Sequence, residues 1–284
     1  MHTYNDAFYE LKRQLQPLYD AGEAAAMAHE ALHHITKKKK LQRIMEKHAL
    51  LTEQEEHLFE DMTAQLLTGK PLQYLTSKAW FMGREFYVDE HVLIPRPETE
   101  ELVQWVLDDH KDDTVLSIID IGTGSGCIPI SLKLALNKAR ITTCDVSYDA
   151  IEVAKRNARK LEAAVEFIEI DFLQEAHWPL LGKYDVIVSN PPYIPIGEKN
   201  MLHVNVQAHE PELALFVPDE DALLFYRKIA LFGKGHLKKG GMIYCEAHTD
   251  HALATAAVFE EQSYTGVIAK KDLHDNMRMV RATL

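Results

Sequence analysis

From about residue 98 to the C-terminus, short apolar runs alternate with segments of helical periodicity. The run "VLSIIDI" (115–121) predicts a strand, and it is followed by a glycine loop and by "CIPISLKLALN", which predicts a helix. Strands that alternate with helices predict a doubly wound, mostly parallel sheet, because parallel strands need a long crossover connection. Seven strands are expected, at 115–121, 139–146, 165–172, 183–190, 240–247, 263–270 and 277–284.

The first 77 residues differ, because they show helical spacing and no strand-like alternation. Thr52 and Glu55 form the pattern of a capping box at the start of one helix. Gly69, followed by Pro71, predicts the end of the same helix. We therefore expect a small helical domain over residues 1–77, with a role in docking a partner.

Residues 78–97 are expected to link two domains. The stretch "EFYVDEHVLIPRP" is rich in aromatic and β-branched residues and has a polar break at Asp89-Glu90, which predicts a β-hairpin. Pro95 and Pro97 then favour an extended path. The larger α/β domain is expected over residues 98–284.

Net charge, cysteine spacing and the distribution of apolar residues exclude some classes of protein. A net charge of −12 argues against a surface built to wrap nucleic-acid phosphates. Cys127, Cys144 and Cys245 lack metal-ligand or redox spacing, and buried thiols in a reducing compartment are expected. We find no apolar signal region after Met1 and no stretch long enough to span a membrane, so we expect a cytoplasmic protein.

A glycine-rich loop follows the first strand of the expected sheet. In "DIGTGSG" the glycines are Gly122, Gly124 and Gly126, with Thr123 and Ser125 between them. Glycines lack side chains, so the backbone there can approach a ligand closely at the carboxyl end of the strand. The spacing differs from that of dinucleotide-binding folds, and a tight turn without a ligand is the alternative interpretation.

Acidic residues end the next two strands. Asp145 follows the second strand, where a carboxylate can accept both hydroxyls of a ribose, although capping of a helix is an alternative role. Asp171 and Phe172 close the third strand. The acid can accept a hydrogen bond from an adenine amino group and the ring can pack on a base, or Phe172 can simply belong to the core.

The fourth strand ends in Asn190-Pro191-Pro192-Tyr193. The prolines donate no backbone N–H, so the segment offers acceptors: the Asn190 side-chain oxygen and the Pro191 carbonyl. Tyr193 adds a flat face. Acceptors beside a plane suit a planar NH2 group, such as an amide or an aromatic amine.

Together these motifs resemble the class I S-adenosylmethionine-dependent methyltransferases that methylate amino nitrogens. The segments "GKPLQYL" (69–75), "LIPRPETE" (93–100) and "HEPELAL" (209–215) narrow the resemblance to the peptide chain release factor glutamine N5-methyltransferases. The match runs from about residue 65 to 230 in the family's order, whereas the first 60 residues match only in being helical.

The resemblance implies a seven-stranded Rossmann-like methyltransferase fold. It implies S-adenosyl-L-methionine as cofactor, with S-adenosyl-L-homocysteine as product, and release factors as protein substrates in translation termination. The cofactor residues would be Asn190, Asp145, Asp171, Phe172 and the loop 122–126. Asn190, Pro191, Pro192 and Tyr193 would bind the substrate, with Asn190, Pro191 and Tyr193 as the catalytic set.

The sequence departs from the family at three points. Phe172 stands where the family often has tryptophan, "FVPDEDA" follows "EPELAL", and "CEAHTDHA" (245–252) differs from the usual glycine- and glutamine-containing version. The segment "FVPDEDA" lies in the loop on the substrate side, so the shape of this loop is expected to differ from that in the family.

Two other enzyme classes share most of these motifs: glutamine methyltransferases of a ribosomal protein, and adenine-amino methyltransferases of DNA or RNA. An adaptor that only binds the cofactor is a further alternative. We expect no metal site, since neither His33-His34 nor His248 with His251 has a third ligand in the sequence pattern. The run Lys37–Lys40 is expected to be a solvated helix face, with an acidic partner or RNA as the alternative. We expect a monomer that binds no nucleic acid stably and no membrane.

Overall fold

The computed structural model describes residues 1–110 and 115–284 and divides the chain into two compact units. Unit 1 comprises Met1–Ser77 together with His203–His209. Unit 2 comprises Lys78–Leu202 and Glu210–Leu284. Residues 78–97, which were expected to be a linker, thus pack as part of unit 2.

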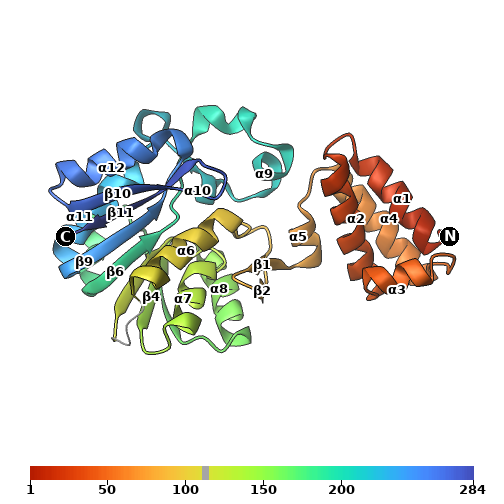
Figure 1. The fold of residues 1–284 in the computed structure, drawn as a ribbon, viewed down its shortest axis with the longest axis horizontal. Coiled ribbons are helices and arrows are strands. Elements are labelled where there is room, and N and C mark those ends of the chain that lie inside the picture. Colours follow the sequence, from red (N-terminus) through yellow and green to blue (C-terminus); the bar gives the residue numbers. More distant parts are fainter. Residues whose placement is uncertain (111–114) are drawn as a thin grey trace. The chain divides into compact units, whose positions relative to one another are not determined.

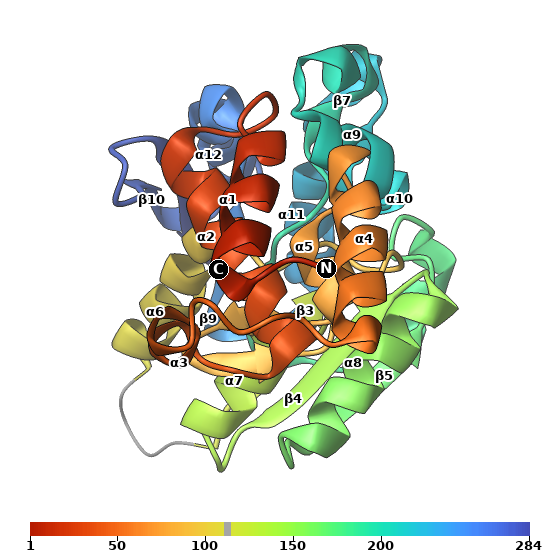
Figure 2. The same cartoon turned by 90° about the vertical axis from the view of Figure 1, so that its right-hand side faces the viewer.

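Unit 1 is a bundle of helices (Figures 1 and 2). Thr52 caps the fourth helix by accepting from the Glu55 N–H, and Gly69 follows its last turn with φ 86°, as the sequence predicted. His203 and His209, at the two ends of the added segment, lie 3.2 Å from the carbonyls of Leu18 and Thr68. The helices are α1 (Tyr4–Leu15), α2 (Ala21–Thr36), α3 (Lys40–Met45), α4 (Glu53–Leu67), α5 (Leu72–Thr76) and α9 (Val204–His209).

Unit 2 is built on a seven-stranded sheet with the order β10-β11-β9-β6-β3-β4-β5. Strand β11 runs opposite to the other strands of this sheet, so the prediction of a mostly parallel, doubly wound sheet is confirmed. The strands are β3 (Ser117–Ile121), β4 (Arg140–Asp145), β5 (Val165–Glu169), β6 (Tyr184–Ser189), β9 (Leu237–Glu246), β10 (Thr265–Lys271) and β11 (Met277–Thr283). Short pairs are formed by β1 (Ala79–Phe81) with β2 (Arg84–Phe86) and by β7 (Ile194–Pro195) with β8 (Phe216–Val217).

Helices cover both faces of this sheet, and each face has its own apolar core (Figure 1). On β3, Ile118 packs with the core under α6, α7 and α8, whereas Ile119 packs with the core under α11 and α12. This alternation follows from the strand period of two residues, and it explains why the strands are apolar on both faces. The helices are α6 (Pro97–Asp109), α7 (Cys127–Ala135), α8 (Tyr148–Lys160), α10 (Glu212–Leu215), α11 (Leu224–His236) and α12 (Ala252–Glu261).

The strand order changes direction between β3 and β6. The chain leaves β3 toward β4 and β5 and then returns to place β6 on the other side of β3. Ile121 and Ser189, the last residues of the two strands, are register partners, and the Ser189 hydroxyl donates to the Ile121 carbonyl at 2.6 Å. The loops that follow these strands therefore start side by side, at the position where open α/β sheets bind ligands.

The predicted hairpin exists, but its predicted position is wrong. The turn lies at Met82 and Gly83, between β1 and β2, and not at Asp89-Glu90. Both turn residues have positive φ, 48° and 71°, which is the requirement of the tight hairpin turns that follow strand twist. Asp89 instead accepts hydrogen bonds from Tyr87 and from the His91 backbone.

A buried amide fastens this region to the glycine loop. Asn157 of α8 is fully buried, and its side chain accepts from the Tyr87 N–H at 2.7 Å. It donates to the carbonyls of Tyr87 and Ser125, each at 2.9 Å. One side chain thus holds the chain after β2 and the loop after β3 against the same helix.

A buried carboxyl lies beneath the glycine loop. Asp120 is fully buried, and its Oδ2 accepts from the Thr143 hydroxyl, which itself lies 2.7 Å from the Thr123 hydroxyl. Its Oδ1 has no partner among the described residues. Burial raises the pKa of Asp120 to about 8, with a smaller contribution from the charge of Asp145, so the group is largely protonated at neutral pH.

Replacing Asn157 with alanine should lower the free energy of unfolding by roughly 2–4 kcal/mol, because it leaves buried backbone groups of Tyr87 and Ser125 without partners. Urea unfolding measures the change. The exposed Asn137→Ala variant is the control and should change stability little. Equal stability of both variants would contradict the role given to Asn157.

The stabilising effect of Asp120→Asn should grow with pH. Between about pH 4 and 8 the carboxyl ionises in the unfolded chain but stays protonated in the folded one, so the wild type loses stability as pH rises. The neutral asparagine lacks this loss. Urea unfolding of the ligand-free proteins at pH 5, 6.5 and 8 measures the difference, and a difference that does not vary with pH would show that Asp120 ionises normally.

Candidate active site

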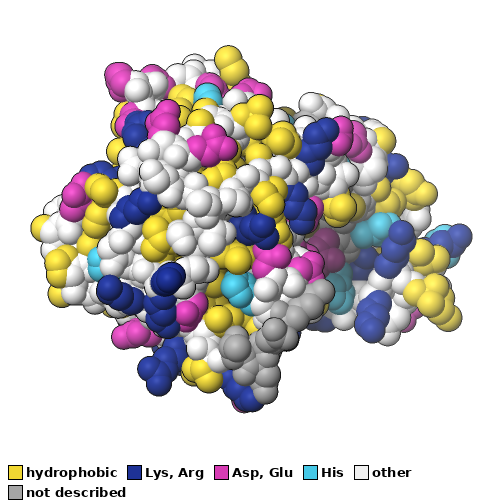
Figure 3. All heavy atoms as spheres, turned by 60° about the vertical axis from the view of Figure 1, so that its left-hand side comes forward, with side chains coloured by type: hydrophobic (Ala, Val, Ile, Leu, Met, Phe, Trp, Pro, Cys, Tyr) yellow, Lys and Arg dark blue, Asp and Glu magenta, His cyan; other side chains and the backbone are white. Residues whose placement is uncertain are grey.

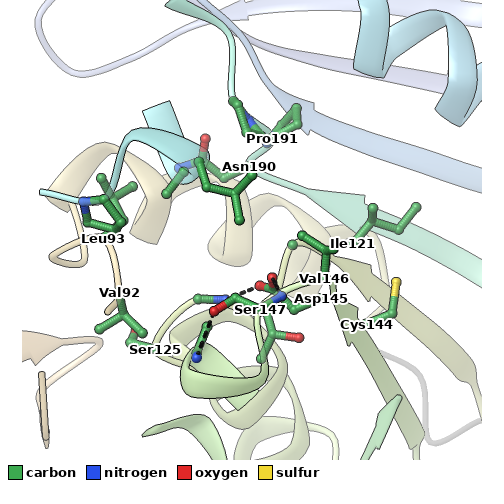
Figure 4. Close-up of a pocket in the computed structure, with 18 of the residues that line it drawn as sticks. Val92, Leu93, Ile121, Ser125, Cys144, Asp145, Val146, Ser147, Asn190 and Pro191 are labelled. Carbon is green, nitrogen blue, oxygen red and sulfur yellow. Dashed lines mark hydrogen bonds between the residues drawn. The ribbon is translucent and has the colours of Figure 1, made fainter. Parts of the chain in front are cut away.

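A cavity of about 300 Å³ opens in unit 2 at the carboxyl ends of β3, β4 and β6. In Figure 4, Asn190 and Pro191 lie on one side of it and Asp145 with Ser147 on the other, while Val92 and Leu93 form a third wall. The segments that line it are 91–93, 95–96, 99, 121–125, 127–128, 144–147, 150, 170–173, 190–192, 211, 213–214 and 225.

The glycine loop forms the floor between β3 and α7. Gly122, Gly124 and Gly126 have φ values of 91°, 50° and 79°, a region that side chains disfavour. A Cβ on Gly126 would lie 2.8 Å from the Ile130 side chain, so the tight packing of α7 also requires glycine there. A Cβ on Gly122 would lie 3.9 Å from the Asn190 carbonyl, which shows how close this loop is to the segment after β6. The loop therefore has a backbone conformation that favours glycine at these positions, and its binding of a ligand stays a prediction.

Asp145 stands at the end of β4 and faces the cavity. Its Oδ2 accepts from the Gly124 N–H at 3.0 Å and its Oδ1 from the Ser147 N–H at 2.9 Å. Burial raises its pKa, and these backbone hydrogen bonds oppose the rise. Each carboxylate oxygen keeps a second lone pair, so both can still accept from hydroxyl groups in the cavity.

Asp171 and Phe172 line the cavity next to this wall. The Asp171 carboxylate accepts from the Leu173 N–H at 3.0 Å and from the Gln174 side chain at 2.9 Å. Phe172 is 6% exposed and packs edge-on against Phe232 with a centroid distance of 5.3 Å. The ring belongs to the core and also borders the cavity, so packing of Phe172 on a base stays a prediction.

Three of the four residues after β6 line the cavity: Asn190, Pro191 and Pro192. The Asn190 side-chain NH2 donates to the Thr99 hydroxyl at 3.0 Å, and its Oδ1 has no donor among the described residues. Tyr193 is not among the described residues that line the cavity, because its hydroxyl turns toward Glu246 at 3.3 Å. Burial raises the pKa of this phenol well above its usual value.

The structure adds residues that sequence reasoning did not single out. Glu210 is buried, pairs with Arg96 at 2.5 Å and accepts from the Ile94 N–H at 3.3 Å. This ion pair holds the segment "HEPELAL" against the segment "LIPRPETE" beside the cavity. Opposite charges in two motif segments were a signal for it, but spacing along the chain does not reveal that the segments meet.

No group of three or more histidine, cysteine or acidic residues is arranged to hold a metal in the described part of the chain. Cys144 and Cys245 are buried, and Cys127 is partly so. Within residues 1–110 and 115–284, no helix combines the length and apolar character needed to cross a membrane.

Comparison with known protein families assigns both parts of the chain. Residues 99–208 match the family described as "Methyltransferase small domain". Residues 6–76 match the family described as "PrmC N-terminal domain".

Individual relatives agree with these matches. The release factor glutamine methyltransferase of Flavobacterium psychrophilum is 42% identical over 226 residues, which is 78% of this chain and 79% of the relative. The enzyme of the same name from Bacteroides thetaiotaomicron is 37% identical over 96% of this chain and 97% of the relative. A methyltransferase structure from Pyrococcus furiosus has a TM-score of 0.51 at 16% identity, covering 79% of this chain and 98% of that one, and supports the fold alone. The chain belongs to the release factor glutamine methyltransferase family.

Proposed function

We propose that this protein transfers a methyl group from S-adenosyl-L-methionine to the side-chain amide N5 of a glutamine in peptide chain release factors. Membership of the family supports this reaction. The observation that carries it is the arrangement of one cavity, which the glycine loop lines from one strand end and the acceptor-rich segment Asn190–Pro192 from the next.

The residues present fit this cofactor. The glycine loop leaves space where side chains would intrude, and Asp145 has acceptor capacity left for the two ribose hydroxyls. Asp171 and Phe172 border the place where the adenine would lie. When bound, the cofactor supplies an activated methyl group on a sulfonium sulfur.

Asn190 and Pro191 would prepare the acceptor nitrogen. The nitrogen of a glutamine amide is a poor nucleophile because its lone pair is delocalised into the carbonyl. Two acceptors, the Asn190 Oδ1 and the Pro191 carbonyl oxygen, would hold both N–H groups and favour a pyramidal nitrogen as positive charge develops. This contribution is positioning and electrostatic stabilisation, and it needs no strong general base because the proton becomes acidic once the new N–C bond forms.

The two alternative substrates receive less support. A nucleic-acid methyltransferase would be expected to carry a basic groove, whereas this chain has a net charge of −12. On the face shown in Figure 3, basic side chains are interspersed with acidic and apolar ones. Methylation of a ribosomal protein would use the same chemistry, but the relatives of this chain are named for release factors, which favours a release factor as the substrate.

We also propose that unit 1 docks the protein substrate. The match of residues 6–76 to a domain defined in this family supports the idea, because a separate domain can add contacts with the substrate to those that the cavity makes. The chain is proposed to act as a cytoplasmic monomer.

Asp145→Ala should weaken binding of S-adenosyl-L-methionine by about tenfold or more, because it removes two acceptor oxygens from the cavity. Isothermal calorimetry measures the affinity. Asp149→Ala, an exposed acid at the start of α8, is the matched control. Equal affinity of Asp145→Ala and wild type would count against this cofactor position.

Asn190→Ala should slow methylation by about 100-fold or more, because one transition-state hydrogen bond is lost. Asn190→Asp keeps an acceptor oxygen but adds a charge near the sulfonium, so its rate should fall between alanine and wild type. The measurement is single-turnover methylation of a purified release factor at saturating cofactor, with mass spectrometry to locate the modified glutamine.

Thermal melts separate loss of function from loss of folding in these variants, with Asn137→Ala as the control. A near-normal rate for a folded Asn190→Ala protein would refute the role of Asn190. If the wild type methylates a ribosomal protein or nucleic acid and leaves release factors unmodified, the proposed substrate is wrong.

A further inference from the structure

A series of hydrogen bonds runs from Asn190 through Thr99, which also lines the cavity, to the buried Glu246. The Asn190 NH2 donates to the Thr99 hydroxyl at 3.0 Å, and that hydroxyl donates to Oε2 of Glu246 at 2.6 Å. Tyr193 donates to the other carboxylate oxygen at 3.3 Å. The residues come from the first turn of α6, the segment after β6 and the end of β9, which are distant in sequence.

The Glu246 carboxylate fixes the direction of donation in this series of hydrogen bonds. A threonine hydroxyl has one proton, and Oε2 of Glu246 accepts it. Because Thr99 gives its proton to Glu246, it can offer Asn190 only an acceptor. The NH2 end of the Asn190 amide must then face Thr99, and the oxygen end is left for the cavity.

Burial of Thr99 and Glu246 strengthens the preference for this direction of the hydrogen bonds. Thr99 is 2% exposed and Glu246 1% exposed, so water does not compete for their hydrogen bonds. Burial raises the pKa of Glu246, whereas the hydrogen bond from Thr99, the charge of Arg278 and the hydrogen bond from Tyr193 oppose that rise.

We propose that Thr99 and Glu246 are positioning residues that orient the Asn190 amide so that its oxygen, and not its NH2 group, meets the acceptor nitrogen of the substrate. The inference rests on the proposed function and extends it to two residues that would act through the Asn190 amide. With the amide reversed, an NH2 group would face the NH2 group of the substrate, and no hydrogen bond could form between them.

Two variants disturb these hydrogen bonds with little change in the shape of the side chain. Thr99→Val replaces the hydroxyl by a methyl group and removes the acceptor for the Asn190 NH2. Glu246→Gln keeps the shape but introduces an NH2 donor, which permits Thr99 to reverse and the Asn190 amide to turn over. Both should lower kcat for release factor methylation by about tenfold or more, up to the loss seen in Asn190→Ala, with little change in KM or in cofactor affinity by calorimetry.

Two comparisons distinguish positioning from a general structural role. Thr99→Ser keeps the hydroxyl and should recover most of the rate that Thr99→Val loses. In the Asn190→Ala background, Glu246→Gln should cause no further loss, because the amide it orients is already absent. Thr255→Val, a buried threonine of α12 whose hydroxyl has no partner among the described residues, is the matched control for the valine substitution.

A wild type that leaves release factors unmodified would refute the proposed function, before any variant is compared. An active wild type with near-normal kcat in folded Thr99→Val would overturn the positioning role. So would a multiplicative loss in the Asn190→Ala/Glu246→Gln double variant. If Glu246→Gln does not fold, the Thr99 pair decides the question on its own.

Discussion

The parallel pairing of β3 with β6 is the constraint on which the site depends. Ile121 and Ser189 are register partners, and both strands end there. Two loops therefore begin at adjacent points on one edge of the sheet. One loop contains the glycines 122, 124 and 126, and the other contains Asn190 and two prolines. Neither loop would form a site alone. A shift of register by one residue would turn every side chain of β6 to the opposite face and displace Asn190 from the glycine loop.

Polar groups buried below these two loops hold the loops in one arrangement relative to each other. Asn157 ties the glycine loop to α8 and to the segment after β2, and Asp145 holds the same loop by the Gly124 N–H. Thr99 and Glu246 restrain Asn190 from the other side. Buried polar groups stabilise little when fully paired, but they define one arrangement because every alternative leaves a donor or acceptor unsatisfied. The positions of these two loops in the cavity wall are therefore set by hydrogen bonds to backbone groups and to short polar side chains.

Much of this was predictable from the sequence, and the failures have physical causes. The sheet was foreseen because apolar runs and helical periodicity are local patterns, and motif order at strand ends then located the glycine loop, Asp145 and Asn190. The hairpin was misplaced because the composition of residues 85–97 outweighed one glycine at position 83, whose positive φ sets the turn. The grouping of His203–His209 with the helical unit, the pair of Arg96 with Glu210 and the chain through Thr99 to Glu246 all join residues far apart in sequence. No local pattern encodes such contacts.

The absence of N–H groups at Pro191 and Pro192 has a consequence for selectivity. A glutamate side chain has nearly the same shape as glutamine, but it would bring two acceptor oxygens, which share one negative charge, toward a wall that presents acceptors of its own. The proposed geometry would leave those oxygens without donors from Asn190 Oδ1 or the two prolines, which is more costly than a small misfit of shape. Because Pro191 and Pro192 have no backbone N–H group to donate to a carboxylate, the site would disfavour a substrate whose glutamine has been deamidated to glutamate.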